Sequence, residues 1–306
     1  MSRIARVPAG RRLETAAVAL GTVLFVGVAN AHSALGNAPD ANSASSATVA
    51  AVIVIALVGY GRGLAGVWRR TTRGRREALL RALAFAGGLA AVAMALLSPI
   101  DRLGAQLFAI HMIQHELLML IAAPLLVIGR PLPLFLWALT QDLRAKAARF
   151  ALSRPLQAMW TVLLSPIVAW LLHALALWVW HVPQFFDAAL RNAAVHDAQH
   201  LTFLLAALVF WAAMIETRNR EQQGAALIYL FTTTVHTSVL GALITFATQP
   251  WYGAYLNTPA SWGLTALEDQ QLGGLIMWVP GSLVYVGVAL ALLLRWIRAS
   301  DATATL

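Results

Sequence analysis

The chain has 306 residues, of which 59% are hydrophobic and only 11% are charged, and it carries a formal net charge of +9. A water-soluble domain of this size needs a polar outer surface that so few charged residues cannot form, so the composition excludes a soluble enzyme. The basic residues form short clusters without interleaved aromatic residues, which favours membrane lipid over nucleic acid as a partner. Cysteine is absent, so any metal site must use other ligands, such as histidine or methionine.

The N-terminal region has the pattern of a secretory signal. Residues 15–31 are apolar, follow a basic segment and end in a small-x-small motif at 29–31. We expect residues 1–31 to be a signal peptide or an uncleaved signal anchor, and residues 32–45 to be a flexible outer segment. Cleavage after residue 31 would leave His32 at the mature N-terminus, where its amine and imidazole could chelate copper together.

Seven further apolar stretches are candidates for membrane spans, which take roughly 20 residues each. They cover residues 46–61, 78–98, 105–128, 157–181, 194–216, 225–247 and 271–297. We therefore predict an all-α fold, a polytopic membrane bundle of seven transmembrane helices over residues 46–298, followed by a cytoplasmic tail, 299–306. A short amphipathic helix is expected at the inner surface within residues 130–156.

The distribution of basic residues predicts the orientation of this bundle. All lysines and arginines except Arg102 and Arg191 fall on one side, which the positive-inside rule assigns to the cytoplasm. The N-terminus of the mature chain is then outside and the C-terminus is cytoplasmic. The acids show no such bias, so the outer half is net negative and would attract cations. The outer loop 248–270 is rich in tryptophan and tyrosine, as expected at a membrane interface.

Histidine is concentrated in the outer half of the predicted bundle. His111 and His115, and again His196 and His200, have i, i+4 spacing, which places two imidazoles on one helix face about 6 Å apart along the axis. One such pair also arises by chance, but two pairs at matching depth favour convergence on a metal ion, because polar side chains in lipid turn inward. The predicted metal ligands are His111, His115, His181, His196, His200, His236 and Met119.

The residue types narrow the choice of metal. Imidazole suits zinc, copper, iron and nickel, whereas thioether selects monovalent copper. Met119 follows His115 by four residues and continues the same stripe, which favours copper(I), although ordinary packing is the alternative for one methionine. We expect Asp101, Glu116 and Asp197 to orient ligand imidazoles, with a role as helix-end charges in water as the alternative for the two aspartates.

Three segments resemble the CtaG-type cytochrome c oxidase assembly factors, seven-helix membrane proteins of bacteria. They are HMIQHELLMLIAAPLLVIGRPLPLFLWAL (111–139), WVWHVPQFFDAALRNAAVHDAQHLTFLLAALVFWAAMI (178–215) and DQQLGGLIMWVPGSLVY (269–285), and the resemblance extends over roughly 46–298. It implies a non-enzymatic protein of the bacterial plasma membrane that handles copper at the outer face during assembly of the oxidase. The implied partners are cytochrome c oxidase subunits and periplasmic copper carriers.

Within this resemblance, the matching positions are the histidines already singled out by the topology. They are His111, His115, His181, His196 and His200. Glu116 departs from the pattern, because an apolar residue or methionine is expected there in relatives. A carboxylate at this position would make the site richer in oxygen and less selective for copper(I).

Two other functions stay open at this point. A seven-helix membrane hydrolase would hold zinc with three histidines and use Asp101, Asp197 or Glu116 as acid or base. A copper permease would need polar or methionine ligands that continue to the cytoplasmic face, and His173 and His236 are the two deep imidazoles. We expect a copper-binding assembly factor, with zinc as the alternative metal.

Overall fold

The computed structural model describes residues 41–70, 74–217 and 220–304, and these residues are helical, without a strand. Six helices are long and apolar enough to cross a membrane. They are Ser45–Trp68, Arg75–Leu97, Phe108–Gly129, Ala193–Ile215, Glu221–Thr245 and Ala266–Arg298. A seventh span results if Arg154–Leu163 and Pro166–Trp180 form one interrupted helix. The predicted all-α class, a bundle of apolar membrane-length helices, is confirmed.

Some predicted boundaries lie elsewhere. The predicted signal segment, 1–31, and residues 32–40 of the flexible segment lie outside the described residues. The first described helix begins at Ala41, so the end of the predicted flexible segment is helical, and the last helix continues through the predicted tail to Ala304. The predicted fourth span is interrupted before Pro166, which has no N–H to continue the preceding helix and instead begins a new one.

The chain divides into two compact units, the first comprising the described residues up to Ala90 with Leu125–Leu164. Its helices are α2 (Ala41–Trp68), most of α3 (Arg75–Leu97), most of α6 (Ala123–Gly129), α7 (Pro131–Ala138), α8 (Gln141–Ala151) and α9 (Arg154–Leu163). An aromatic cluster of Tyr60, Phe85 and Phe135 packs in its core. Tyr60 stacks on Phe85 with ring centroids 4.3 Å apart, and Phe135 lies edge-on to both.

The region 130–156, within which a short amphipathic helix was predicted, contains α7, α8 and the start of α9. Arg130, with a left-handed φ of 43°, separates α6 from α7. Arg144 of α8 donates to the carbonyls of Leu136 and Leu139, at the C-terminal end of α7. The Arg144 guanidinium also lies 4.3 Å from the ring centre of Trp137. These contacts fasten α8 to α7.

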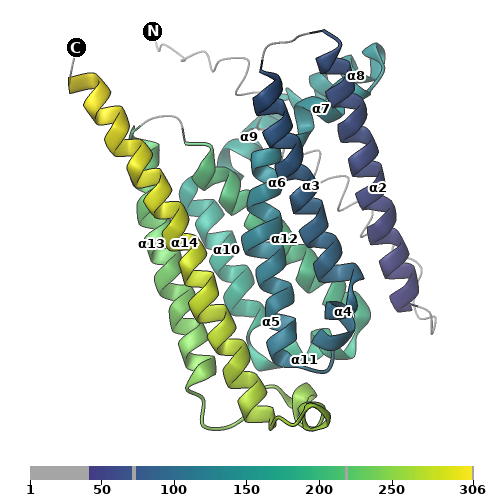
Figure 1. Cartoon of the computed structure of the whole chain (residues 1–306), viewed down its shortest axis with the longest axis vertical. Coiled ribbons are helices and arrows are strands. Elements are labelled where there is room, and N and C mark those ends of the chain that lie inside the picture. Colours follow the sequence, from purple (N-terminus) through teal and green to yellow (C-terminus); the bar gives the residue numbers. More distant parts are fainter. Residues whose placement is uncertain (1–40, 71–73, 218–219, 305–306) are drawn as a thin grey trace. The chain divides into compact units, whose positions relative to one another are not determined.

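The second unit comprises Ala91–Pro124 and the chain from Ser165 onward. Its helices are α4 (Pro99–Gly104), α5 (Phe108–Glu116), the π-helix η1 (Leu117–Ala122), α10 (Pro166–Trp180), α11 (Pro183–Arg191), α12 (Ala193–Ile215), α13 (Arg220–Thr245), the 3₁₀ turns η2 (Gly253–Tyr255) and η3 (Pro259–Trp262), and α14 (Ala266–Ala304). α14 packs along α13 and α5, while α12 packs against α10 and η1 (Figure 1).

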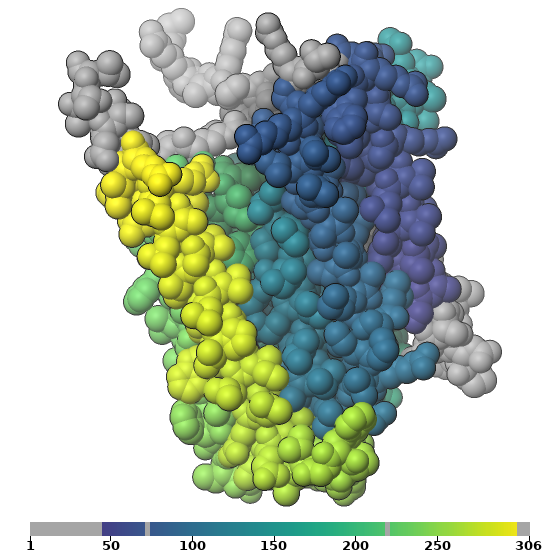
Figure 2. Space-filling view, viewed as in Figure 1, coloured from purple at the N-terminus to yellow at the C-terminus, as the bar shows by residue number. Residues whose placement is uncertain are grey.

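One side of α14 is both exposed and apolar. Leu272, Leu275, Val279, Leu283 and Val286 recur at intervals of three or four residues, which places them on one helix face. In Figure 2, α14 is drawn in yellow and lies on the visible surface. An exposed apolar face of this length suits contact with lipid rather than with water.

Candidate metal centre

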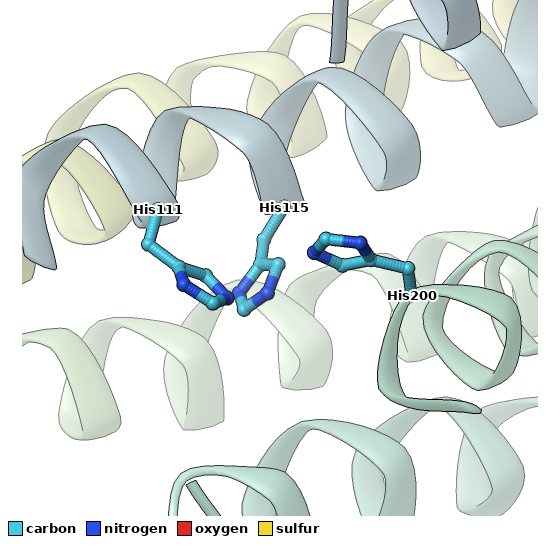
Figure 3. Close-up of side chains that lie close together, drawn as sticks. All are labelled: His111, His115 and His200. Atoms are coloured by element: carbon cyan, nitrogen blue, oxygen red, sulfur yellow. The ribbon is translucent and has the colours of Figure 1, made fainter. Parts of the chain in front are cut away.

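Three buried imidazoles of the second unit point toward one another. His111 and His115 lie on α5, His200 lies on α12, and Figure 3 shows their rings close together. One nitrogen atom from each ring lies within 4.8 Å of the others. The three residues are 0%, 4% and 5% exposed. Among the described residues, this is the group of histidine and carboxylate donors close enough to share a metal ion, and we call it the histidine triad.

A carboxylate from α14 holds the N-terminus of α5. Asp269 accepts hydrogen bonds from the backbone N–H groups of Phe108, at 2.6 Å, and Ala109, at 3.1 Å. These are two of the N–H groups that a helix leaves unpaired in its first turn. α14 comes this close because residue 273 is glycine, where a Cβ atom would lie 2.3 Å from the Phe108 ring. The cap thereby fixes the helical turn that precedes and carries His111.

A second contact joins α12 to the helix that follows α5. That helix, η1, is π-helical, a form that occurs mostly as short insertions and often at functional sites. Within it, the carbonyl of Met119 accepts a hydrogen bond of 2.8 Å from Nε1 of Trp211, and both residues are buried. The bond ties the helix of His111 and His115 to the helix of His200.

His196 extends the triad along α12. Its ring centroid lies 4.2 Å from that of His200 and 5.3 Å from that of His111. His196 is partly exposed, whereas the triad is buried. Of these histidines, His196 is therefore the one that solvent can reach.

His181, which follows α10, lies beside the triad next to His115. The two ring centroids are 6.1 Å apart. Nδ1 of His181 is 2.7 Å from the carbonyl of Leu177, and because a carbonyl only accepts, this nitrogen carries the proton and Nε2 keeps a free lone pair. The structure thus brings five of the six histidines predicted as ligands into one cluster.

Several nitrogen atoms of this cluster are buried and have no hydrogen-bond partner in the described part of the chain. They are Nε2 of His111, His181 and His200 and both ring nitrogens of His115. A buried, unsatisfied polar atom costs about 1–3 kcal/mol, so such atoms usually have a functional reason. Neutral imidazole binds metals through its nitrogen lone pair, and this donor set fits a metal ion that accepts three nitrogen ligands.

Aromatic side chains cover part of the cluster. Phe186 of α11 is fully buried, with its ring centroid 5.0 Å from that of His111 and 6.2 Å from that of His181. Tyr252 and Tyr255, from the loop between α13 and α14, pack against Phe186. Burial raises the pKa of both tyrosines above the ordinary value, so both hydroxyl groups keep their hydrogen at neutral pH. Both can therefore donate hydrogen bonds.

Two of the acids predicted beside the ligands lie near His196. Asp101 accepts a hydrogen bond of 2.8 Å from Nε2 of Gln114. The charges of Asp101 and Asp197 both act on the His196 ring. Negative charge therefore gathers at the one histidine of the cluster that is partly exposed.

Three other predicted site residues lie outside the triad. The carboxylate of Glu116 is directed toward Gly281 of α14. A Cβ atom added to Gly281 would lie 3.1 Å from Oε2 of Glu116. His236 accepts a hydrogen bond of 3.4 Å from Nε1 of Trp178. Met119 contributes its carbonyl to the bond that joins η1 and α12. Within the described ranges, the group of donors close enough to share a metal ion includes neither Glu116 nor His236.

Three residues that build the site were not predicted as parts of it. Asp269 caps α5, Trp211 ties α12 to η1, and Tyr255 contacts His111. Their partners are 161, 92 and 144 residues away along the chain. Local spacing carries no information on contacts at such separations, and Tyr255 looks like any aromatic residue of an interfacial loop.

The chain is similar in sequence to known proteins. The chain matches the cytochrome c oxidase caa3 assembly factor family over residues 58–299. Similar proteins are uncharacterized proteins of Mycobacterium bovis and Mycobacterium tuberculosis, each 28% identical over 257 residues, and one of Mycobacterium leprae that is 26% identical. The match covers 82% of this chain but 38% of each relative, so the chain spans about two fifths of their length.

No solved structure matches the chain. The family match covers most of the chain, including α5, α12 and α14 with the residues that form and hold the histidine triad. The chain therefore belongs to the cytochrome c oxidase caa3 assembly factor family.

Proposed function

We propose that this chain is a membrane-bound, non-enzymatic assembly factor that binds copper(I) at the histidine triad and delivers it to the copper centre of cytochrome c oxidase. The observation that supports this most is the convergence of three buried imidazoles with unpartnered nitrogen atoms. Membership in the oxidase assembly factor family supplies the recipient, a cytochrome c oxidase.

The electrostatics of the triad favour copper(I) over zinc. His111, His115 and His200 are neutral donors when they bind metal, and the triad includes no carboxylate. The cost of placing an ion in an apolar interior grows with the square of its charge, so a monovalent ion costs about a quarter as much as a divalent one. Without an anionic ligand to offset the second charge, the site is better suited to copper(I). Zinc is the alternative metal, since imidazole also suits it.

The placement of the acids supports a non-enzymatic role. A zinc hydrolase needs a carboxylate beside the metal-bound water. Among the described residues, no carboxylate belongs to the group of donors close enough to share a metal ion. Asp101 and Asp197 act on His196, outside the triad, and Glu116 is directed toward α14. Each of the deep imidazoles that a copper permease would use has one hydrogen-bond contact, His173 with the Tyr285 hydroxyl and His236 with Trp178. In the part of the chain that the structure describes, neither belongs to a group of donors close enough to share a metal ion.

A partly exposed histidine supplies a point for metal exchange. His196 lies next to His200 and within the influence of Asp101 and Asp197. Negative charge attracts a cation, and an accessible imidazole can take it up before it reaches the buried ligands. We propose that copper passes between the triad and periplasmic carriers or oxidase subunits through His196.

This route requires that the histidine cluster face the outside of the bacterial plasma membrane. α14 supports that orientation, because Asp269 near its start contacts α5 while Arg295 and Arg298 lie near its other end. A separation of 26 residues corresponds to about 39 Å of helix, enough to cross the bilayer. Basic residues mark the cytoplasmic end, so the cluster lies at the opposite, outer end.

The test is the metal content and copper(I) affinity of the protein purified in detergent. We expect the wild type to bind copper(I) and the His111→Ala/His115→Ala double variant to lose it. His236→Ala is the matched control, because it removes an imidazole that lies outside the cluster. Competition with a chromogenic copper(I) chelator measures the affinity. Equal binding by the double variant, or tight zinc in place of copper, would contradict the proposal.

A second readout is oxidase assembly in cells. We expect His111→Ala to abolish the assembly of active oxidase while the amount of folded membrane protein stays near that of the wild type. Normal oxidase assembly in this variant would contradict a role for the triad.

A further inference from the structure

The hydroxyl group of Tyr255 lies between a backbone carbonyl and a ligand imidazole. It is 2.5 Å from the carbonyl of Gly104, at the end of α4, and 3.0 Å from Nδ1 of His111. Tyr255 is 2% exposed, so water does not compete for these contacts. One hydroxyl group thus serves two buried partners of different kinds.

The two partners fix the direction of each hydrogen bond. A carbonyl oxygen has no hydrogen, so the bond to Gly104 must use the single hydrogen of Tyr255. The Tyr255 oxygen can then only accept from His111, which places the imidazole proton on Nδ1. Nε2 of His111 is left with a lone pair, and this nitrogen has no hydrogen-bond partner among the residues that the structure describes.

From this geometry we propose that Tyr255 is a positioning residue, which holds His111 in the tautomer that presents Nε2 to a metal ion in the histidine triad. The proposal rests on the proposed metal-binding function of the triad. Tyr255 comes from a loop that is distant in the sequence, and it acts on the metal through His111. Hydrogen bonds to the far nitrogen of a ligand imidazole have this effect in metal sites generally, where they fix ring orientation and raise ligand basicity.

The surroundings of Tyr255 hold it in place. Its ring lies edge-on to Phe108, the first residue of α5, with centroids 5.9 Å apart, and near Phe186. Gly104 sits close against α5, because a Cβ atom there would lie 3.5 Å from the Cα atom of His111. The loop that carries Tyr255, helix α4 and helix α5 therefore meet at His111. If His111 were protonated on Nε2 instead, Tyr255 would have to donate to Nδ1 and would lose its bond to Gly104.

His181 is also protonated on Nδ1, but the partner of this nitrogen is close in the sequence. The carbonyl of Leu177, four residues earlier, accepts its Nδ1 proton and leaves Nε2 free. In His111, the partner of Nδ1 is instead the hydroxyl group of Tyr255. The tautomer of His111 thus depends on a loop 144 residues away in the sequence.

The first test measures the tautomer in metal-free protein, so that it does not depend on copper binding. In protein labelled with ¹⁵N-histidine, the imidazole ¹⁵N shifts distinguish a protonated Nδ1 from a protonated Nε2, and the His111 signals are assigned by their loss in His111→Gln. We expect Nδ1–H in the wild type and a mixture of tautomers in Tyr255→Phe. A wild type with Nε2–H at His111 would overturn the proposal, even if every variant failed to fold.

The second test measures copper(I) affinity in Tyr255→Phe and Tyr60→Phe. Tyr60 is the matched control, since it is buried and donates to a glycine carbonyl, that of Gly129, at 2.9 Å in the first unit. We expect Tyr255→Phe to lower the affinity about 10–100-fold and Tyr60→Phe to change it by less than about threefold. Equal losses in both variants would overturn the proposal. No copper in the wild type would contradict the proposed function, and the ¹⁵N shifts would still decide the tautomer.

Discussion

The aromatic cluster of the first unit and the histidine triad of the second are both buried, but their polar atoms differ. In the aromatic cluster, the hydroxyl of Tyr60 donates to the carbonyl of Gly129 at 2.9 Å, and its ring stacks on Phe85. In the triad, His115 leaves both ring nitrogens without a partner. The first arrangement stabilises the fold by itself, whereas the second costs stability until a ligand supplies the missing interactions.

The largest effect that tests this difference is expected for His115→Leu. Loss of a triad ligand should lower copper(I) affinity at least about 1000-fold, which corresponds to about 4 kcal/mol. The metal-free protein should be as stable as the wild type or more stable, because two unpartnered buried nitrogens are replaced by apolar atoms. Chelator competition and thermal unfolding measure the two quantities. A large drop in melting temperature without copper would mean that His115 stabilises the fold.

Phe85→Ala should lower the stability of the fold and leave copper(I) affinity unchanged, which is the reverse of the effect expected for His115→Leu. Removing a ring that is 3% exposed and stacked on Tyr60 is expected to cost about 3–5 kcal/mol of stability, while the folded protein keeps its copper(I) affinity. Leu83→Ala is the control on the same helix, because Leu83 is 61% exposed. If Phe85→Ala abolished copper binding in protein that is still folded, the separation between stabilising and ligand-binding regions would be wrong.

The two regions also differ in how far the sequence predicts them. The helices of both units follow from apolar stretches of membrane length, and the all-α class rests on many residues. The apolar pattern runs through the break before Pro166 without change, and the proline itself is what marks the break in the sequence. The contacts of Arg144 that hold α8 to α7 and the left-handed conformation of Arg130 appear only in three dimensions.

Spacing alone was enough to identify much of the candidate site. The i, i+4 pairs His111/His115 and His196/His200 give the two helix faces that meet, with ring centroids of 4.4 and 4.2 Å within each pair. The same periodicity led to Met119, whose sulfur could not be told from core packing. His236 was included as a further imidazole available in the spans, and its partner, Trp178, belongs to another helix. The groups that orient the ligands could not be predicted from local spacing, because they come from segments that are distant in the sequence.

Asp269→Asn should have a smaller effect, and one that links stability to the site. Asparagine keeps the shape of the side chain but has a single acceptor oxygen, so one of the two bonds from Phe108 and Ala109 is lost together with the charge, and we expect a loss of about 1–3 kcal/mol. Copper(I) affinity should fall a few-fold, because the first turn of α5 becomes less fixed. Glu268→Gln is the control, since its exposed carboxylate contacts Thr265 within α14's own cap. An unchanged stability in Asp269→Asn would show that α5 does not depend on this cap.

The smallest effect in stability is expected for Tyr60→Phe, which makes the sharpest comparison with Tyr255→Phe. Each substitution removes one buried hydroxyl that donates to a glycine carbonyl, Gly129 in one case and Gly104 in the other. Each should cost about 1 kcal/mol of stability. Only Tyr255 also accepts from a ligand imidazole, so only its substitution should lower copper(I) affinity. Equal affinities in the two variants would mean that the Tyr255 hydroxyl, like that of Tyr60, stabilises the fold alone.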